Sequence, residues 1–423
     1  MARSARISIL LLLLATACNF PKPPDVPDIS DAPTDTPAGC QRDEDCGSPT
    51  PACVNNACAV CRTSTSCPLS SPVCDDTSHD CRSCETDSEC TSGACNLAAG
   101  TCVDKGGVLY VSPGGSAADP CTMSAPCSLL HASEAADTGH EYIVLLPGEY
   151  TSGANFNAKT VTIAGNGATI DLATAESTID IRNGSSIQIR DLHVKNDVQH
   201  PGSDFNSIIN VIDSTATVTN TQFETSSYDT PGITGVDSTL TLKTSTFSQG
   251  YLNVSGRLVM DNCLFRANAY IVVAGSADIS NSMINSSDRG GIDISSSDPM
   301  HPRSNIFNNT LIAGGVYCTE SASGPRQFTS NIFVNSPHID SSPSCQYDYN
   351  LIFPSVDVIG VGNKTGDPLF VDTANNNFHL QPQSPAIDAA DPTLLSNGHD
   401  FDGISRPQGT RSDIGAFEYV PAP

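Results

Sequence analysis

The second half of the chain repeats one short pattern: an apolar residue, an asparagine two positions later and a second apolar residue five positions after the first. Five segments have this form, the last with a polar first member: Val218/Asn220/Phe223, Met260/Asn262/Phe265, Ile279/Asn281/Ile284, Phe307/Asn309/Ile312 and Asp348/Asn350/Phe353. Three more carry another small polar residue in place of asparagine: Ile189/Asp191/Val194, Leu242/Thr244/Phe247 and Phe328/Ser330/Phe333. The closing residues recur at intervals of 18 to 29 residues, as from Phe247 to Phe265 and from Val194 to Phe223.

This repeat predicts a solenoid of stacked parallel strands. Successive turns stack at ~4.8 Å, so equivalent side chains form columns, with the apolar residues filling the interior. Asparagine tolerates the left-handed backbone of a sharp bend, and its amide can bond to the amide of the next turn. A β-sandwich would instead show strict alternation and hairpin turns, yet Asn-Gly turns are rare here. With further strands around 161–163, 168–171 and 178–181, we expect roughly ten or eleven rungs.

The region before the repeat predicts how the solenoid begins. Val108–Gly115 forms a strand and a glycine turn, Ser128–Asp137 a short helix, and Tyr142–Tyr150 a buried strand. This order resembles the entry into the right-handed β-helices of the pectin-lyase-like superfamily, in which a helix caps the open end. The resemblance implies an all-β, right-handed parallel β-helix over residues 105–365. Cys121 and Cys127 are close enough in sequence to form a disulfide in this cap.

The C-terminal segment, residues 366–423, carries a second resemblance. Its motifs are GDPLFVD from Gly366, FHLQPQSPAID from Phe378, DFDG from Asp400, and DIGAFEY from Asp413. They are similar to the signature of the choice-of-anchor (Q-type) β-helix surface proteins. That family implies an exported, surface-attached β-helix, and most of its members have no assigned reaction.

Residues 40–104 form a cysteine-rich triple repeat that holds 12 of the 18 cysteines. The three groups share the form C-x5-C-x(4–6)-C-x(4–6)-C: Cys40/46/53/58, Cys61/67/74/81 and Cys84/90/95/102. Units this short cannot bury a sufficient core and depend on disulfides, so we expect two per group with the connectivity left open. Zinc at Cys58-x2-Cys61 and Cys81-x2-Cys84 is the competing interpretation, but these pairs are better explained as junctions between repeats, and we expect no metal site.

The N-terminus predicts export and a lipid anchor. Residues 1–17 have a positive start, a short apolar run and small residues before Cys18, which resembles a bacterial lipoprotein signal with Cys18 as the lipidated residue. An ordinary signal peptide that happens to end near a cysteine is the alternative. Residues 18–39, rich in Pro and Asp, read as an extended tether. We therefore expect attachment through Cys18, with the outer membrane and cell surface as the destination.

Charge and composition narrow the partners. A net charge of −26 argues against nucleic acid as a partner. The absence of Trp weakens a sugar-processing interpretation, although ten Tyr could substitute.

Three cysteines remain in the β-helix: Cys318 and Cys345 sit one rung apart and could be bridged, and Cys263 is expected to be a small buried residue. No phosphate loop, nucleophile elbow or calcium motif is present, so we expect no cofactor.

Candidate chemistry gathers beside two insertions, around residues 200–206 and 288–303. The first cluster runs from Arg190 to Asp197 and on to His200 and Asp204; alternation places His193 and Lys195 on one outward face. The second contains Asp288, Asp293 and His301. For both, a solvated strand exterior is the plainer interpretation. Near the C-terminus, we expect Asp400 and Asp402, beside Arg406, to close a turn.

Two functions from different classes remain at this point. The favoured hypothesis is a non-catalytic binding or adhesion module on a disulfide-rich stalk, with an extracellular polysaccharide or a surface protein as partner. The alternative is an extracellular polysaccharide lyase or glycoside hydrolase, which rests on fold analogy alone. A purely structural envelope protein is a third interpretation.

Overall fold

A computed structural model describes residues 39–172, 178–196, 207–225, 231–267, 270–286, 290–295, 304–319, 324–354, 358–394 and 398–421. The chain divides into two compact units, Met1–Arg62 and Thr63–Pro423. Among the described residues, none of the helices has the length and apolar character needed to cross a bilayer. The predicted signal segment, Cys18 and the tether up to residue 38 lie outside the described residues.

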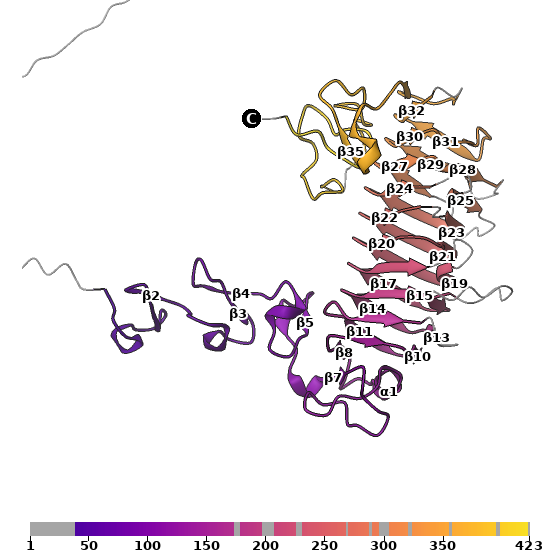
Figure 1. Cartoon of the computed structure of the whole chain (residues 1–423). Coiled ribbons are helices and arrows are strands. Elements are labelled where there is room, and N and C mark those ends of the chain that lie inside the picture. The colour runs from indigo at the N-terminus through magenta and orange to yellow at the C-terminus, as the bar shows by residue number, and fades with distance from the viewer. Residues whose placement is uncertain are drawn as a thin grey trace, which may run out of the picture. The chain divides into compact units, whose positions relative to one another are not determined.

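The second unit is built around an all-β parallel β-helix, as the sequence predicts (Figure 1). One side of the coil is an 11-stranded parallel sheet, which we call the site sheet. Its strands are β9 (Glu149–Tyr150), β12 (Thr169–Asp171), β15 (His193–Asn196), β18 (Gln222–Thr225), β20 (Thr246–Phe247), β22 (Leu264–Phe265), β24 (Met283–Asn285), β27 (Thr310–Ile312), β30 (Ile332–Val334), β32 (Leu351–Phe353) and β33 (Lys364–Thr365).

A 16-stranded sheet, the second sheet, forms the other two sides of the coil. Its main path contains β7 (Val108–Val111), β8 (Tyr142–Leu145), β11 (Thr160–Ala164), β14 (Ser186–Arg190), β17 (Thr215–Thr219), β19 (Pro231–Lys243), β21 (Tyr251–Asp261), β23 (Tyr270–Ser280), β26 (Asn305–Phe307), β29 (Arg326–Thr329) and β31 (Cys345–Asp348). The remaining strands are β10 (Ala154–Asn157), β13 (Ile179–Arg182), β16 (Ile209–Ile212), β25 (Gly291–Ser295) and β28 (Gly315–Cys318). About eight turns carry a strand on all three sides, slightly fewer than the ten or eleven rungs expected. The difference arises because the end rungs have only two sides.

The interior columns follow the predicted repeat. Phe223, Phe247 and Phe265 are fully buried and stack face to face, with ring centroids 4.5 Å apart at each step. Stacked aromatic rings are stabilised by more than the burial of their apolar area, so the column stabilises the middle of the coil. Cys263 is buried and free, and a disulfide joins Cys318 to Cys345, as predicted.

The predicted bend is also present, but two of the eight segments were placed one residue out of register. Asn220, Asn262 and Asn281 have the left-handed backbone expected of them. In the last rungs the left-handed residues are Asn308 and Tyr349, which precede the asparagines of the pattern. The core-facing residues there are Ile306, Leu311, Tyr347 and Ile352, and the prediction was wrong in assigning this role to their successors Phe307, Ile312, Asp348 and Phe353.

The displaced asparagines form a buried polar ladder of their own. Asn309, Asn331 and Asn350 are fully buried, and each donates its side-chain amide to the next side-chain oxygen, at 3.1, 3.1 and 3.2 Å, ending at Asn363. The same oxygens accept the backbone N–H of the preceding rung at 2.9 Å. The ladder therefore satisfies its own amides and the backbone N–H groups of Asn309, Asn331 and Asn350.

The N-terminal end is capped as predicted. Helix α1 (Leu129–Ala135) starts at Ser128, whose hydroxyl accepts the His131 N–H at 3.3 Å, and packs against β10 and β7. The disulfide Cys121–Cys127 lies beside it. The buried hydroxyl of Tyr150 donates to backbone carbonyls at 2.6 and 2.9 Å, which ties β9 to the first rung.

The first and third cysteine-rich repeats are disulfide-bonded in the same order, first to third and second to fourth cysteine, and the second repeat has the same second-to-fourth bond. The pairs are Cys40–Cys53, Cys46–Cys58, Cys67–Cys81, Cys84–Cys95 and Cys90–Cys102; Cys61 and Cys74 are also disulfide-bonded. Their short hairpins are β1 (Ala52–Val54) with β2 (Ala57–Ala59), β3 (Val73–Cys74) with β4 (Cys81–Arg82), and β5 (Cys95–Asn96) with β6 (Thr101–Cys102). The one-turn 3-10 helices among the described residues are Asp43–Asp45, Ser64–Ser66, Asp87–Glu89, Lys105–Gly107 and Thr373–Asn375.

The third repeat packs on the outer face of the second sheet, which the sequence did not predict. The Arg190 guanidinium of β14 lies 3.0 Å from Asp87, and both side chains are buried. Tyr110 of β7 donates its hydroxyl to the Ser92 carbonyl at 3.0 Å, and Ala94 packs beside it. The part of the predicted stalk nearest the coil is thus joined to the first rungs.

The C-terminal segment packs on the outward face of the site sheet. Strands β34 (Phe370–Asp372) and β35 (Asn377–Leu380) form a small antiparallel pair within it. Phe370, Phe378 and Leu380 share a hydrophobic cluster with Ile332 and Leu351 of the site sheet. The segment therefore covers part of the face on which a ligand could lie.

Candidate functional site

The outward face of the site sheet is half covered and half open. From β24 to β32 the C-terminal segment lies on its outward residues and buries several of them, with Met283 at 2% and Leu351 at 0% exposure, whereas Lys364 and Thr365 of the last strand are exposed. On the preceding rungs Gln222 and Glu224 are exposed. The open half is the natural place to look for a site, since it is a rigid strand surface bounded at one end by a wall.

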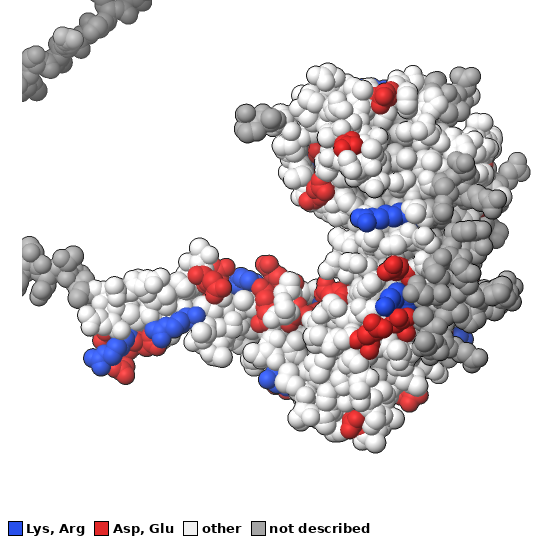
Figure 2. Space-filling model, viewed as in Figure 1, with Lys and Arg blue, Asp and Glu red and all other residues white. Residues whose placement is uncertain are grey.

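A charged strip occupies the first open rungs. Lys195 Nζ lies 3.2 Å from the Asp171 carboxylate and 3.7 Å from that of Glu149. His193 Nε2 lies 3.2 Å from the Glu224 carboxylate on the next rung. His193 and Lys195 flank the buried Val194, which confirms that they share one outward face. We call these five residues the charged strip; Figure 2 shows that blue and red side chains lie beside one another on the coil.

The other residues of the two predicted clusters do not join this strip. Arg190 lies on the second sheet and is buried against Asp87, where burial raises the pKa of the aspartate. His200, Asp204, Asp288 and His301 lie outside the described residues. Asp293, in β25, accepts the Tyr270 hydroxyl at 2.9 Å, and burial raises the pKa of that phenol. The clusters seen in the sequence are therefore spread over different sides of the coil.

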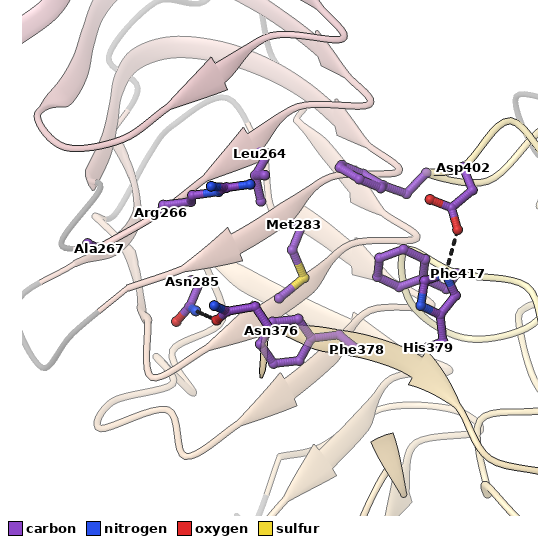
Figure 3. Close-up of a pocket in the computed structure, with 11 residues that line it drawn as sticks. Leu264, Arg266, Ala267, Met283, Asn285, Asn376, Phe378, His379, Asp402 and Phe417 are labelled. Atoms are coloured by element: carbon purple, nitrogen blue, oxygen red, sulfur yellow. Dashed lines mark hydrogen bonds and ion pairs between the residues drawn. The ribbon is translucent and has the colours of Figure 1, made fainter. Parts of the chain in front are cut away.

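A pocket of about 420 Å³ lies where the C-terminal segment meets the open half of the site sheet. It is lined from the sheet side by Leu264, Arg266, Ala267, Met283 and Asn285, and from the segment by Asn376, Phe378, His379, Phe401, Asp402 and Phe417. Figure 3 shows Arg266 and the two asparagines at one end, His379 and Asp402 at the other, and Met283 and Phe378 between them. Its volume is in the range of small-molecule sites, and an apolar middle with polar ends is their usual lining.

The polar groups of the pocket differ in how they are held. His379 Nε2 lies 2.5 Å from Asp402 and Nδ1 lies 2.7 Å from Asn377 Oδ1, while the ring packs on Phe417 with centroids 4.4 Å apart. Asn285 donates its amide to Asn376 at 3.3 Å. Arg266 is exposed, and its guanidinium contacts no carboxylate or other acceptor of the described chain. The histidine is thus fixed in place, whereas the arginine is available to a ligand.

The sequence pointed to His193 and Lys195 of the charged strip, but not to their three carboxylate partners, and it missed the pocket. Asp400 does close the C-terminal turn as predicted, accepting the backbone N–H groups of Asp402, Ile404 and Glu418 at 2.8–2.9 Å. Asp402 was expected in the same role, but its carboxylate instead bonds His379 across the pocket. Arg266 and Asp402 are far apart in the chain, and the only local signal was the Phe378-His379 pair inside a family-like motif.

Comparisons with known proteins add little about activity. No family model matches the chain, and no curated protein matches it. Among solved structures, a crystal structure of pectate lyase Pel9A aligns with 14% identity over 80% of this chain and 100% of that chain, with a TM-score of 0.42.

Proposed function

We propose that this chain is a lipid-anchored bacterial cell-surface protein whose β-helix is a non-catalytic recognition module for an extracellular glycan. The observation that carries the proposal is the pocket at the end of the open strand face, with aromatic rings beside hydrogen-bonding side chains. Sugar rings present apolar faces and a rim of hydroxyls, so they need both kinds of group together. Phe378, Phe401 and Phe417 supply ring surface in a chain that has no Trp.

The ion pairs of the site favour binding over catalysis. A lysine acts as a base only without its proton, and the carboxylates of Asp171 and Glu149 stabilise the protonated ammonium of Lys195. His379 has an oxygen acceptor at each ring nitrogen, so neither nitrogen is directed at the pocket centre. Lys195 and His379 are therefore better suited to holding a binding site in shape than to transferring protons.

Export and anchoring are supported by the cysteine chemistry and the N-terminal sequence. Disulfides persist in oxidising compartments, and this chain has them in the repeats, in the cap and near the last rungs. The residues before Cys18 have the pattern of a lipoprotein signal, and the Pro-rich tether would hold the folded part away from the membrane.

The test is to incubate the full chain with a panel of neutral and acidic polysaccharides. New reducing ends, unsaturated products and depletion of the protein onto each polymer are measured in the same tubes. We expect depletion by some polymers without product. Product from any polymer contradicts the non-catalytic proposal, and His193→Ala and Lys195→Ala then show whether the charged strip supplies the chemistry. Neither depletion nor product contradicts glycan recognition altogether.

A further inference from the structure

We propose, resting on the function proposed above, that the pocket takes the terminal unit of a glycan and that this unit carries a single carboxylate bound by Arg266. The rest of the glycan lies outward over the charged strip and is neutral. The ligand therefore carries one carboxylate, at its chain end, and Arg266 is the cation that binds it.

The open half of the site sheet ends at the pocket. The C-terminal segment buries Met283, Ile332 and Leu351 on the outward face of the site sheet, while Leu264 and Arg266, one rung before Met283, are at least partly exposed. Phe378 and Phe417 form the wall at this boundary. A polymer that follows the stack of strands toward the pocket cannot continue past it. The pocket, at about 420 Å³, therefore holds the end of a chain rather than its middle.

Arg266, unlike Lys195, is a cation that can bind the carboxylate of a ligand. The outward column of the site sheet runs through Asp171, Lys195 and Glu224, and two rungs further it reaches Arg266, beside the buried Phe265. Lys195 already has two carboxylates within 3.7 Å. The guanidinium of Arg266, by contrast, makes no bond to the residues that the structure describes, and it can grip a carboxylate with two parallel hydrogen bonds.

The charged strip favours a glycan whose remaining units are neutral. The charged strip holds three carboxylates, those of Glu149, Asp171 and Glu224, against the ammonium of Lys195 and a histidine. It begins two rungs from Arg266, or ~10 Å at the usual strand spacing. A polymer with an acid on every unit would place carboxylates against these acids and be repelled. A chain with its acid at the terminus avoids this repulsion and keeps the Arg266 contact.

The remaining lining suits the body of such a unit. Asn285 and Asn376 stand beside Arg266 and offer amide donors and acceptors to ring hydroxyls, while Met283 and Phe378 form an apolar floor. The one acid in the pocket, Asp402, is at the opposite end and is paired with His379. The carboxylate of the ligand is therefore directed to the arginine end.

The experiment is binding of the full chain to an array of immobilised glycans in four groups. These are neutral chains, chains that end in one carboxylated unit, chains with internal acids only, and polyuronates. We expect signal from chains that end in a carboxylated unit, and its loss when that carboxyl is esterified. Arg266→Gln should weaken this binding roughly ten- to hundred-fold, as expected for a charge-assisted hydrogen-bond pair.

The matched control is Lys243→Gln, which removes the same charge from an exposed position on the second sheet and should leave binding unchanged. Binding of neutral chains or polyuronates that survives Arg266→Gln overturns the inference but leaves glycan recognition standing. No signal from any of the four groups overturns both. Equal loss in the two variants also overturns the inference, because it points to general charge rather than to Arg266.

Discussion

At the residue scale, the charged groups of the C-terminal segment are buried as a connected set. Arg406 and Glu418 are both fully buried and lie 2.7 Å apart, and Glu418 also accepts the Asp413 backbone N–H at 2.8 Å. Asp413 accepts backbone N–H groups of Asp388 and Tyr419 at 2.7 and 2.6 Å. Burial outweighs these bonds and the nearby Arg406, and raises the pKa of Asp413 to about 6.

This shift predicts a pH dependence of stability. The pKa of Asp413 is higher in the folded protein than its unfolded value of 3.8. Its contribution to the free energy of unfolding is therefore fully present below pH 3.8 and is lost as pH rises through about 6. The loss is at most on the order of 3 kcal/mol. Urea unfolding of the wild type and Asp413→Asn at several pH values between 4 and 7.5 should show the wild type losing stability relative to the variant. Asp237→Asn, at an exposed bend, is the control, and a constant difference between wild type and Asp413→Asn would contradict the prediction.

At the element scale, each rung depends on its neighbours through side-chain columns rather than through propensity. In the last rungs the asparagine ladder bonds both to itself and to backbone groups: Asn331 accepts the Asn309 N–H at 2.9 Å and donates to the Ile306 carbonyl at 2.8 Å. Removing one member leaves buried polar groups on both neighbouring rungs without partners. Such groups are costly because no water replaces the lost bond.

We therefore expect Asn331→Ala to reduce the free energy of unfolding by about 2–4 kcal/mol. Chemical denaturation measures the loss, and hydrogen exchange should show it concentrated in the last rungs. Asn305→Ala is the matched control, because this asparagine is exposed and its side chain donates to the Asp278 carboxylate at 2.9 Å. Equal losses in the two variants would mean that burial of the ladder contributes nothing.

At the scale of the whole molecule, the third cysteine-rich repeat and the C-terminal segment are joined to different sides of one coil. The third cysteine-rich repeat packs on the second sheet through Arg190 and Asp87, and the C-terminal segment packs on the site sheet. A buried ion pair is weak support for stability in itself, but breaking it leaves an uncompensated charge. The junction between repeat and coil should therefore be sensitive to either residue.

Asp87→Ala should cost about 3–5 kcal/mol at this junction, because it leaves the Arg190 guanidinium buried without its carboxylate. Hydrogen exchange of residues 84–111 should rise, while exchange in the last rungs stays as in the wild type. The double variant Asp87→Leu with Arg190→Met should recover much of the loss, since two apolar side chains need no pairing. Failure of the double variant to recover would show that packing, not charge, holds the repeat.

Anchoring is the prediction that belongs to the entire chain. Cys18→Ser should abolish incorporation of a labelled fatty acid and move the protein from the membrane fraction to the soluble fraction. The mutant should retain the disulfides of the folded part, which a thiol-alkylation assay checks. Membrane association that persists in Cys18→Ser would contradict a lipid on this residue as the anchor.

The coil could be predicted from the sequence alone, because the inward side of a rung is set by local spacing. Phe223, Phe247 and Phe265 fall at equivalent positions of successive turns, so their stacking could be predicted from the repeat. The disulfide Cys121–Cys127 is equally local. Where two asparagines adjoin, at Asn308 and Asn309, the pattern allows two registers, and packing of the last rungs chose the one that the sequence did not indicate.

The parts of the chain that cover the coil, and therefore the site, could not be predicted from local sequence, because they depend on packing between distant segments. Arg266 and Asp402 meet in one pocket because the C-terminal segment buries its apolar residues on the site sheet, an arrangement set by the shape of two surfaces rather than by any spacing in the chain. The same holds for Arg190, whose polar neighbours in sequence suggested a site and whose burial against Asp87 made it a structural contact. Periodicity records which side of a strand faces inward, whereas the outward side is assigned by whatever distant part of the chain packs there.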